Sequence, residues 1–232
     1  MDPALKNLRE SVCEANLDLN RRGLVLYTFG NASGIDRERG LVVIKPSGVP
    51  YERLTPANLV VTDLQNRVVE GDLRPSSDLK THTALYRAWP TIGGVVHTHS
   101  THATAWCQAR RDLPCFGTTH ADYARGTVPC APPLAAHEVA GDYEEATGAQ
   151  IVRAFADRDP SQTPMVLVGG HAPFTWGKDA AQAAYHAVIL EELCRMALLT
   201  LQIDPAAKPL PPAIGAYHWE RKHGVSATYG QK

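Results

Sequence analysis

The sequence predicts one α/β domain in which a central mixed or antiparallel sheet is flanked by helices. The length of 232 residues suits one hydrophobic core better than two independent domains, so we expect a single domain over 1–232. Helical and strand-like hydrophobic periods alternate along the chain. About 70 residues separate the apolar strand at 95–100 from the next strong strand at 165–170, which disfavours a regular series of parallel βαβ units.

The first third of the chain contains one helical segment followed by strand-like segments. Apolar residues recur every three or four positions from 4 to about 22, and Gly23 follows where a helix C-cap would fall. This pattern predicts an amphipathic helix. The β-branched runs at 41–45 and 59–63 predict strands, and 67–71 predicts a hairpin return.

Helices and strands continue to alternate in the rest of the sequence. The segment 78–89 has helical periodicity, with Ser76 or Ser77 as its expected N-cap and Pro90 at its end. A buried strand at 95–100 begins after two glycines. Beyond a stretch rich in Pro, Gly and Cys at 112–133, we expect the following elements: a helix at about 136–157, a strand at 165–170 and a helix at about 179–202.

The last segment, 204–232, begins with a proline-rich stretch. Four prolines between 204 and 216 predict an extended rather than a helical conformation. The aromatic and charged residues that follow, YHWERKHGVSATYGQK, need a surface on which to dock.

Composition excludes several classes of function. There are 23 basic and 24 acidic residues, for a formal net charge of −1, so no electrostatic footprint for nucleic acid or an anionic membrane exists and a small-molecule partner is expected. Five widely spaced cysteines form no CxxC pair, which indicates reduced thiols in the cytosol. The N-terminus lacks an apolar signal-peptide core and no segment is apolar enough to span a membrane.

The segment VVHTHSTHA contains the strongest chemical signal in the sequence. His97 and His99 share a strand face, because side chains alternate with a period of two, and their Cα atoms lie ~6.5–7 Å apart. Two imidazoles at this spacing can bind one metal ion. His171, which follows the apolar run MVLV and two glycines, is the best third ligand, and His102 is a weaker candidate. Three histidines indicate an open catalytic site, with Zn²⁺ as first choice and Mn²⁺ or Co²⁺ open.

Three loops are suited to phosphate. RPSSDLKTH places hydroxyls at a helix start, where free N–H groups favour an anion, although this segment alone would be an ordinary serine cap. TFGNASG at 28–34 and IKPSGV at 44–49 each place small residues beside hydrogen-bonding ones in a turn. Asp78 would repel a phosphate unless a cation lay between them or its side chain turned away. A metal held by the three histidines would resolve this conflict, so we expect Asp78 to face the metal.

Long motifs throughout the chain resemble the class II aldolase and epimerase family, and within it the L-ribulose-5-phosphate 4-epimerases. The resemblance covers essentially the whole length and rests on these segments: GNASGIDRERG, VIKPSGV, RPSSD, IGGVVHTHSTHATAW, GTTHADYARGTVPC, PFTWGK and RKHGVSATYGQ. It implies a class II aldolase-like fold.

The resemblance also implies roles for individual residues. It implies a metal site at Asp78, His97, His99 and His171. It implies that the phosphate pocket is formed by Gly30, Asn31, Ser47, Gly48, Ser76 and Ser77, with Lys45 as a candidate assistant. Proton transfer is assigned to Asp122 and Tyr229. The family members are homotetramers with sites between subunits, so Tyr229 would come from a neighbouring chain, with His218 and Arg221 as further candidates, and the segment 204–232 would dock at that interface.

The implied reaction inverts C4 of L-ribulose 5-phosphate to give D-xylulose 5-phosphate. C4 carries no acidic hydrogen, so inversion requires retro-aldol cleavage of the C3–C4 bond and re-addition, with a divalent ion stabilising the enediolate. Two alternatives stay open: an aldolase acting on fuculose or rhamnulose 1-phosphate, and a non-catalytic metal and sugar-phosphate binding module. The aldolases have Glu at the position of Asp78, which favours the epimerase. The sequence leaves open whether arabinose catabolism, ascorbate catabolism or another route supplies the substrate.

Overall fold

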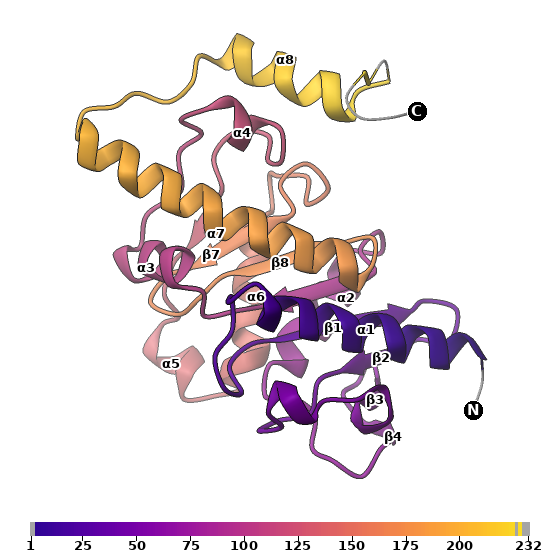
Figure 1. Cartoon of the computed structure of the whole chain (residues 1–232). Helices are drawn as coiled ribbons and strands as arrows, with labels where there is room; N and C mark the ends of the chain where they lie inside the picture. The colour runs from indigo at the N-terminus through magenta and orange to yellow at the C-terminus, as the bar shows by residue number, and fades with distance from the viewer. Residues whose placement is uncertain (1–2, 226, 229–232) are drawn as a thin grey trace.

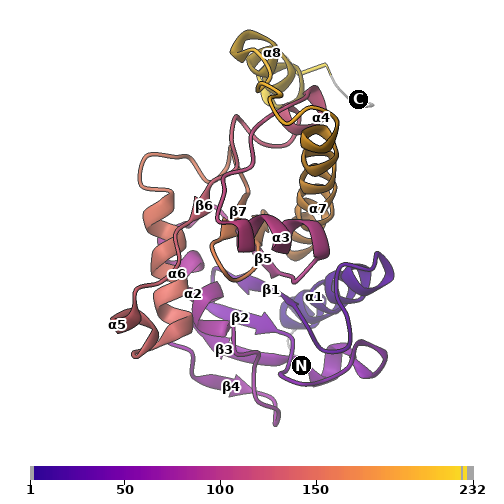
Figure 2. The same cartoon turned by 90° about the vertical axis from the view of Figure 1, so that its left-hand side faces the viewer.

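The computed structural model describes residues 3–225 and 227–228, and it consists of a sheet covered by helices on both faces (Figures 1 and 2). Among the described residues the sheet has eight strands, in the order β4-β3-β2-β1-β5-β8-β7-β6. Neighbouring strands are antiparallel except for β6 and β7, which are parallel. The predicted α/β class with a mixed sheet is therefore confirmed.

The strands are short, and the central ones are buried. Their bounds are β1 Asn31–Asp36, β2 Leu41–Ile44, β3 Val60–Asp63, β4 Val68–Glu70, β5 Gly94–His97, β6 Cys130–Ala131, β7 Met165–Val168 and β8 Phe174–Gly177. The strand β5 lies between β1 and β8, with His97 opposite Asn31 on one side and Phe174 on the other.

The helices occupy both sides of this sheet. Their bounds are α1 Pro3–Arg21, α2 Leu79–Ala88, α3 Thr101–Ala109, α4 Thr118–Ala121, α5 Ala136–Val139, α6 Tyr143–Ala154, α7 Ala180–Ile203 and α8 Pro212–His223, with two short 3₁₀ helices at Tyr51–Arg53 and Pro56–Asn58. In the described part of the chain, no helix is both long and apolar enough to cross a bilayer. All five cysteines are unpaired.

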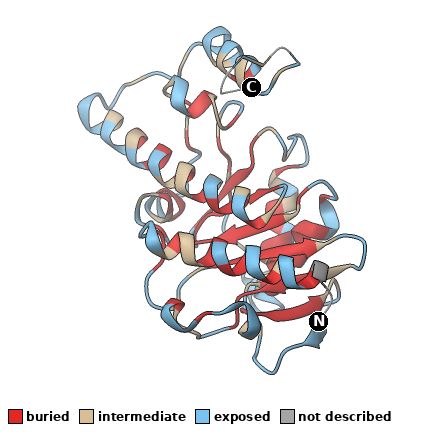
Figure 3. Ribbon diagram, turned by 45° about the vertical axis from the view of Figure 1, so that its right-hand side comes forward, coloured by how far each residue is buried: buried red, intermediate tan, exposed pale blue. Residues whose placement is uncertain are grey.

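Alternation along the strands divides the core into layers. Val43 and Val96 pack with α1 and α7 on one face, whereas Val42, Ile44 and Val95 pack with α2 and α6 on the other. Figure 3 shows the buried strands between helices whose outer faces are exposed. A third apolar cluster joins α3, α7 and β7. Apolar residues thus pack on both faces of β5, at whose end the histidines begin.

The two glycines before β5 allow the start of α7 to approach the sheet. A Cβ atom on Gly94 would lie 2.3 Å from the carbonyl carbon and oxygen of Asp179, the N-cap residue of α7. On Gly93 it would lie 2.0 Å from the carbonyl oxygen of Lys178. The predicted glycine pair therefore marks close backbone packing, because any side chain there would displace the helix.

The predicted turn at 28–34 is wrong from residue 31 onward, because 31–36 forms β1. Asn, Ser and Gly have weak strand propensity, but β1 pairs with β2 and β5 near the middle of the sheet, and this tertiary pairing decides its conformation. The strand β8 was also not predicted.

The predicted helix at 136–157 is two helices, so that prediction is wrong at 140–142. Gly141 interrupts the helical run, and Asp142 begins α6 as an N-cap whose Oδ1 accepts a hydrogen bond of 3.2 Å from the backbone N–H of Glu145. The break places the N-terminus of α6 at the edge of the pocket described below.

Three predicted boundaries are also wrong. Asp78, not Ser76 or Ser77, occupies the N-cap position of α2. The strand β5 ends at His97, so the predicted strand to 100 is too long. The predicted extended segment 204–216 is helical from Pro212, because a proline at the first helical position loses no intrahelical hydrogen bond.

Candidate active site

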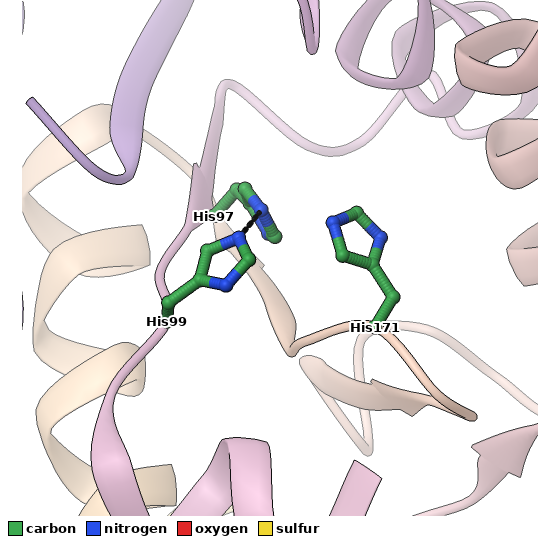
Figure 4. Close-up of side chains that lie close together, drawn as sticks. All are labelled: His97, His99 and His171. Carbon is green, nitrogen blue, oxygen red and sulfur yellow. Dashed lines mark hydrogen bonds between the residues drawn. The ribbon is translucent and has the colours of Figure 1, made fainter. Parts of the chain in front are cut away.

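Three imidazoles meet at the end of the sheet (Figure 4). His97 is the last residue of β5, His99 lies in the turn before α3, and His171 lies in the turn between β7 and β8. One nitrogen from each ring can be chosen so that all three lie within 4.8 Å of one another. The predicted histidine set is therefore brought together, with His97 buried and His99 exposed to solvent.

Neighbouring groups fix the orientation of His97. Its Nδ1 donates a hydrogen bond of 2.9 Å to the carbonyl of Pro173, and its Nε2 faces Nε2 of His99 at 3.1 Å. Phe174 stacks on the same ring, with a centroid distance of 4.2 Å. A metal ligand commonly donates its other ring N–H to a carbonyl in this way.

The pKa values of His99 and His171 are both lowered, which favours the neutral form that can bind a metal. Partial desolvation of the ring, together with neighbouring His97, lowers the pKa of His99. Burial and the two other imidazoles lower the pKa of His171 to about 4, so that ring is neutral near pH 7. Its buried Nδ1 has no hydrogen-bond partner among the described residues. Neutral imidazoles with converging lone pairs are the donor set that Zn²⁺ prefers.

Asp78 lies in the same pocket, but it is not one of the three mutually close ligands. Asn31 Nδ2 donates a hydrogen bond of 2.7 Å to Oδ2 of Asp78. Burial acts to raise the pKa of Asp78, yet the charges of His97 and His82 and the bond from Asn31 together hold it below its ordinary value. Asp78 is therefore an ionised carboxylate beside the histidines, and direct ligation stays a prediction.

The predicted phosphate residues line the same pocket as the histidines. The pocket has a volume of about 460 Å³ and its lining includes Gly30, Asn31, Ser47, Gly48, Ser76 and Ser77. The loops meet because the Ser47 N–H donates to the Arg74 carbonyl at 2.9 Å and the Ser76 N–H donates to the Lys45 carbonyl at 3.0 Å. One cavity therefore holds both the imidazoles and the small-residue loops.

Gly30 joins these loops to the histidine strand. Its φ is +71°, and a Cβ atom there would lie 2.8 Å from the carbonyl oxygen of His97. Only glycine fits such a conformation and such a contact. The loop before β1 can therefore rest directly on the end of β5.

Lys45 places a positive charge in the pocket. Its side chain contacts the ring face of Tyr51, with Nζ at 4.9 Å from the centroid, and it forms no ion pair with any described residue. Burial lowers the pKa of Lys45 to about 8. A buried cation without a carboxylate beside it is suited to an anionic ligand.

Sequence reasoning missed part of the pocket wall. Tyr143 and Glu144, from the N-terminus of α6, line the pocket, and the Tyr143 ring lies 5.8 Å from that of His171. Thr28 and Phe29 line it from the loop before β1. The N-cap pattern around Asp142 could have indicated the helix start, but no local signal indicates that this start faces the histidines.

The two predicted proton-transfer residues do not join this pocket within the described chain. Asp122 is the C-cap residue of α4, and it interacts with α8: its Oδ1 lies 3.1 Å from His218 Nδ1, and its Oδ2 accepts a bond of 3.5 Å from Arg221. Figures 1 and 2 show α4 and α8 together, and Figure 2 shows both apart from β5. Tyr229 lies outside the described residues. The roles of Asp122 and Tyr229 therefore stay predictions.

His102, the weaker ligand candidate, contacts α7. Its Nδ1 lies 2.7 Å from Oε1 of Glu191 on α7. His102 is therefore not one of the three close ligands.

Comparison with known proteins identifies the family. Residues 10–198 match the model of the Class II Aldolase and Adducin N-terminal domain. The chain belongs to the class II aldolase family. The chain is 52% identical over 228 residues to L-ribulose-5-phosphate 4-epimerase UlaF of Salmonella paratyphi B. The aligned region covers 98% of this chain and 100% of that protein. The predicted resemblance is thereby confirmed.

Solved structures agree with this family. An L-fuculose 1-phosphate aldolase has a TM-score of 0.77 at 23% identity, covering 93% of this chain and 95% of that one, and shows the fold alone. The L-fuculose-1-phosphate aldolase from Thermus thermophilus has a TM-score of 0.68 at 26% identity, covering 88% of this chain and 98% of that one. The class II aldolase-like fold predicted from the sequence is confirmed.

Proposed function

We propose that this protein is an L-ribulose-5-phosphate 4-epimerase that forms D-xylulose 5-phosphate and binds Zn²⁺ through His97, His99 and His171. The observation that carries the proposal is that one pocket contains three converging imidazoles and a buried lysine without an ion-pair partner among the described residues. A cation site and an anion site in one cavity match a sugar phosphate that is held at both ends. The 52% identity to an enzyme of this name supports the same reaction.

The chemistry requires that a carbon–carbon bond break and re-form. C4 has no acidic hydrogen, so the C3–C4 bond is cleaved and the aldehyde fragment is re-added through its opposite face. A bound divalent ion supplies Lewis-acid stabilisation of the negative charge on the ketose fragment. The loops at 47–48 and 76–77, with Lys45, hold the phosphate, so that the aldehyde fragment stays bound while it rotates.

Proton transfer at the C4 oxygen needs one group on each face of the sugar. We assign these roles to Asp122 and Tyr229, supplied to each pocket by a neighbouring subunit of a homotetramer. Asp122 lies outside the pocket lining of its own chain, which supports a role in another subunit's pocket. Positioned acid–base groups of this kind contribute ~10²–10⁴-fold.

Cysteine usage supports a reducing compartment for this reaction. All five thiols are unpaired, and three of them, Cys13, Cys107 and Cys194, are almost fully buried. We therefore propose that the enzyme acts in the cytosol.

The deciding experiment is incubation with L-ribulose 5-phosphate, with and without a strong chelator. We expect D-xylulose 5-phosphate to form, activity to disappear on metal removal, and Zn²⁺ to restore it; parallel additions of Mn²⁺ and Co²⁺ identify the metals that the site accepts. A His171→Ala variant is the matched loss-of-site control. Undiminished activity after complete metal removal contradicts the proposal. Accumulated dihydroxyacetone phosphate and free aldehyde from a deoxyketose 1-phosphate would instead identify an aldolase.

A further inference from the structure

A carboxylate from a distant helix holds the segment that follows the metal histidines. Glu191 lies in the middle of α7. Its Oε1 accepts a hydrogen bond of 2.9 Å from the backbone N–H of His102, and its Oε2 accepts bonds of 3.1 Å from the same group and 2.9 Å from the backbone N–H of Ala103. The His102 ring adds a contact of 2.7 Å between Nδ1 and Oε1. Glu191 therefore contacts both the backbone and a side chain of this segment.

These backbone groups are the free N–H donors of the first turn of α3. Ser100 occupies the N-cap position, but its side chain forms no capping hydrogen bond. The donors of a helix start need acceptors, and a negative charge is favoured there by the helix dipole. Glu191 therefore caps α3 from another helix.

Glu191 is ionised in this position. Burial acts to raise its pKa, but the hydrogen bonds from Ala103 and His102 outweigh burial and lower the pKa of Glu191 below its ordinary value. Charge-assisted hydrogen bonds of this kind are about twice as strong as neutral ones.

The backbone held by Glu191 follows shortly after His99, which has fewer contacts than His97. His97 is held by β5, by Pro173 and by Phe174. His99 lies beyond the end of β5, is exposed, and forms its hydrogen-bond contact with His97 alone among the described residues. The position of the His99 ring therefore depends on the backbone of 98–100, which β5 fixes at one end and Glu191 at the other.

We propose that Glu191 is a positioning residue for the metal site, which anchors the start of α3 and thereby presents His99 to the ion. The inference rests on the proposed metal binding and not on the identity of the sugar. Supporting groups around metal ligands typically change metal affinity by about 10–100-fold when removed. Glu191 would not contact a metal ligand itself; it would act on His99 through the backbone of the turn.

The test compares Glu191→Gln with Glu192→Gln. Glu192 is the adjacent residue in the same helix, is exposed, and pairs with Arg195 at 3.2 Å, so it is a matched control. Zinc affinity of each metal-free protein is measured by competition with a chromophoric chelator, after far-UV circular dichroism has established native helix content. We expect Glu191→Gln to bind Zn²⁺ about tenfold or more weakly, and Glu192→Gln to match the unchanged protein.

Two readouts separate positioning from general stabilisation. In Glu191→Gln, excess Zn²⁺ should restore kcat, with the KM for the sugar phosphate little changed. A lower melting temperature with zinc affinity equal to that of Glu192→Gln would overturn the inference. Should Glu191→Gln not fold, Glu191→Asp shortens the side chain by one methylene group and draws the carboxylate away from the N–H groups of His102 and Ala103, and unaltered zinc affinity in that variant would also overturn the inference. Absence of epimerisation in the unchanged protein would sink the proposed function but leave the zinc comparison valid.

Discussion

Lys45 carries a cationic group on a side chain that is only 1% exposed. Burying an unpaired charge is costly, and the lowered pKa of Lys45, about 8, reflects that cost. A phosphate dianion in the pocket would offset it, because a nearby opposite charge favours the protonated amine. Lys45 is thus expected to favour binding of an anionic ligand and not to stabilise the folded protein by itself.

We expect Lys45→Met to raise the KM for L-ribulose 5-phosphate by about 10–100-fold, since a hydrogen bond to a charged group contributes ~1.5–3 kcal/mol. The protonated amine is lost as pH rises through about 8, so the KM of the unchanged enzyme should also rise above that pH. The KM of the variant should stay flat there. Initial rates between pH 7 and about 9.5 check both effects. Lys6→Met, at an exposed lysine of α1, is the control; equal KM values in the two variants would contradict the phosphate role.

Residues whose roles are encoded locally could be predicted from the sequence. His97 and His99 are two positions apart, and His171 follows a strand and a glycine pair, so the set could be predicted without a structure. Tyr143 and Glu144 could not, because they reach the pocket only through the packing of α6 against α2. Long-range packing of this kind leaves no periodic signal.

Among the elements, those with strong local preference were predicted. The strands β2 and β3 are β-branched runs, and α1 and α7 are long and periodic. The strand β1 could not be identified from NASGID, because its pairing with β2 and β5 outweighs weak propensity. The same pairing aligns Asn31 with His97, so the least predictable strand carries a residue of the site.

At the contact between β5 and α7, we expect Gly94→Ala to destabilise the protein by about 1–3 kcal/mol, because the added methyl group overlaps the Asp179 backbone. The urea midpoint measures this change. Gly117→Ala is the control, since a Cβ atom there meets nothing within 4 Å and the backbone φ of −151° is open to any residue. Equal midpoints for both variants would show that α7 can move away from the sheet freely.

In the molecule as a whole, the chemical groups are divided between two regions. The histidines and the loops at 47–48 and 76–77 lie at the end of the sheet, whereas Asp122 lies with His218 and Arg221 where α4 meets α8. The proposed reaction needs both regions, so assembly of subunits would complete each pocket. This division could not be predicted from a sequence pattern, because the surroundings of Asp122 depend on where the chain runs after α7.

Co-expressed variants can test this division. His171→Ala removes a pocket but keeps Asp122, and Asp122→Asn does the reverse. Each variant alone should be nearly inactive. Hybrid tetramers purified through two different affinity tags should recover activity, at about a quarter of the sites when the two chains mix randomly around a ring. Hybrids as inactive as their parents would place Asp122 in the pocket of its own chain or outside the reaction.

The turn between α5 and α6 separates a part of the pocket wall that can change in sequence from the histidine cluster. The three imidazoles lie at or just beyond strand ends in the middle of the molecule, but Tyr143 and Glu144 follow a surface turn at 140–142. Surface turns tolerate insertions that strand ends do not. Lengthening this turn would therefore reshape the wall of the pocket that Tyr143 and Glu144 form, while the three imidazoles at the strand ends keep their geometry.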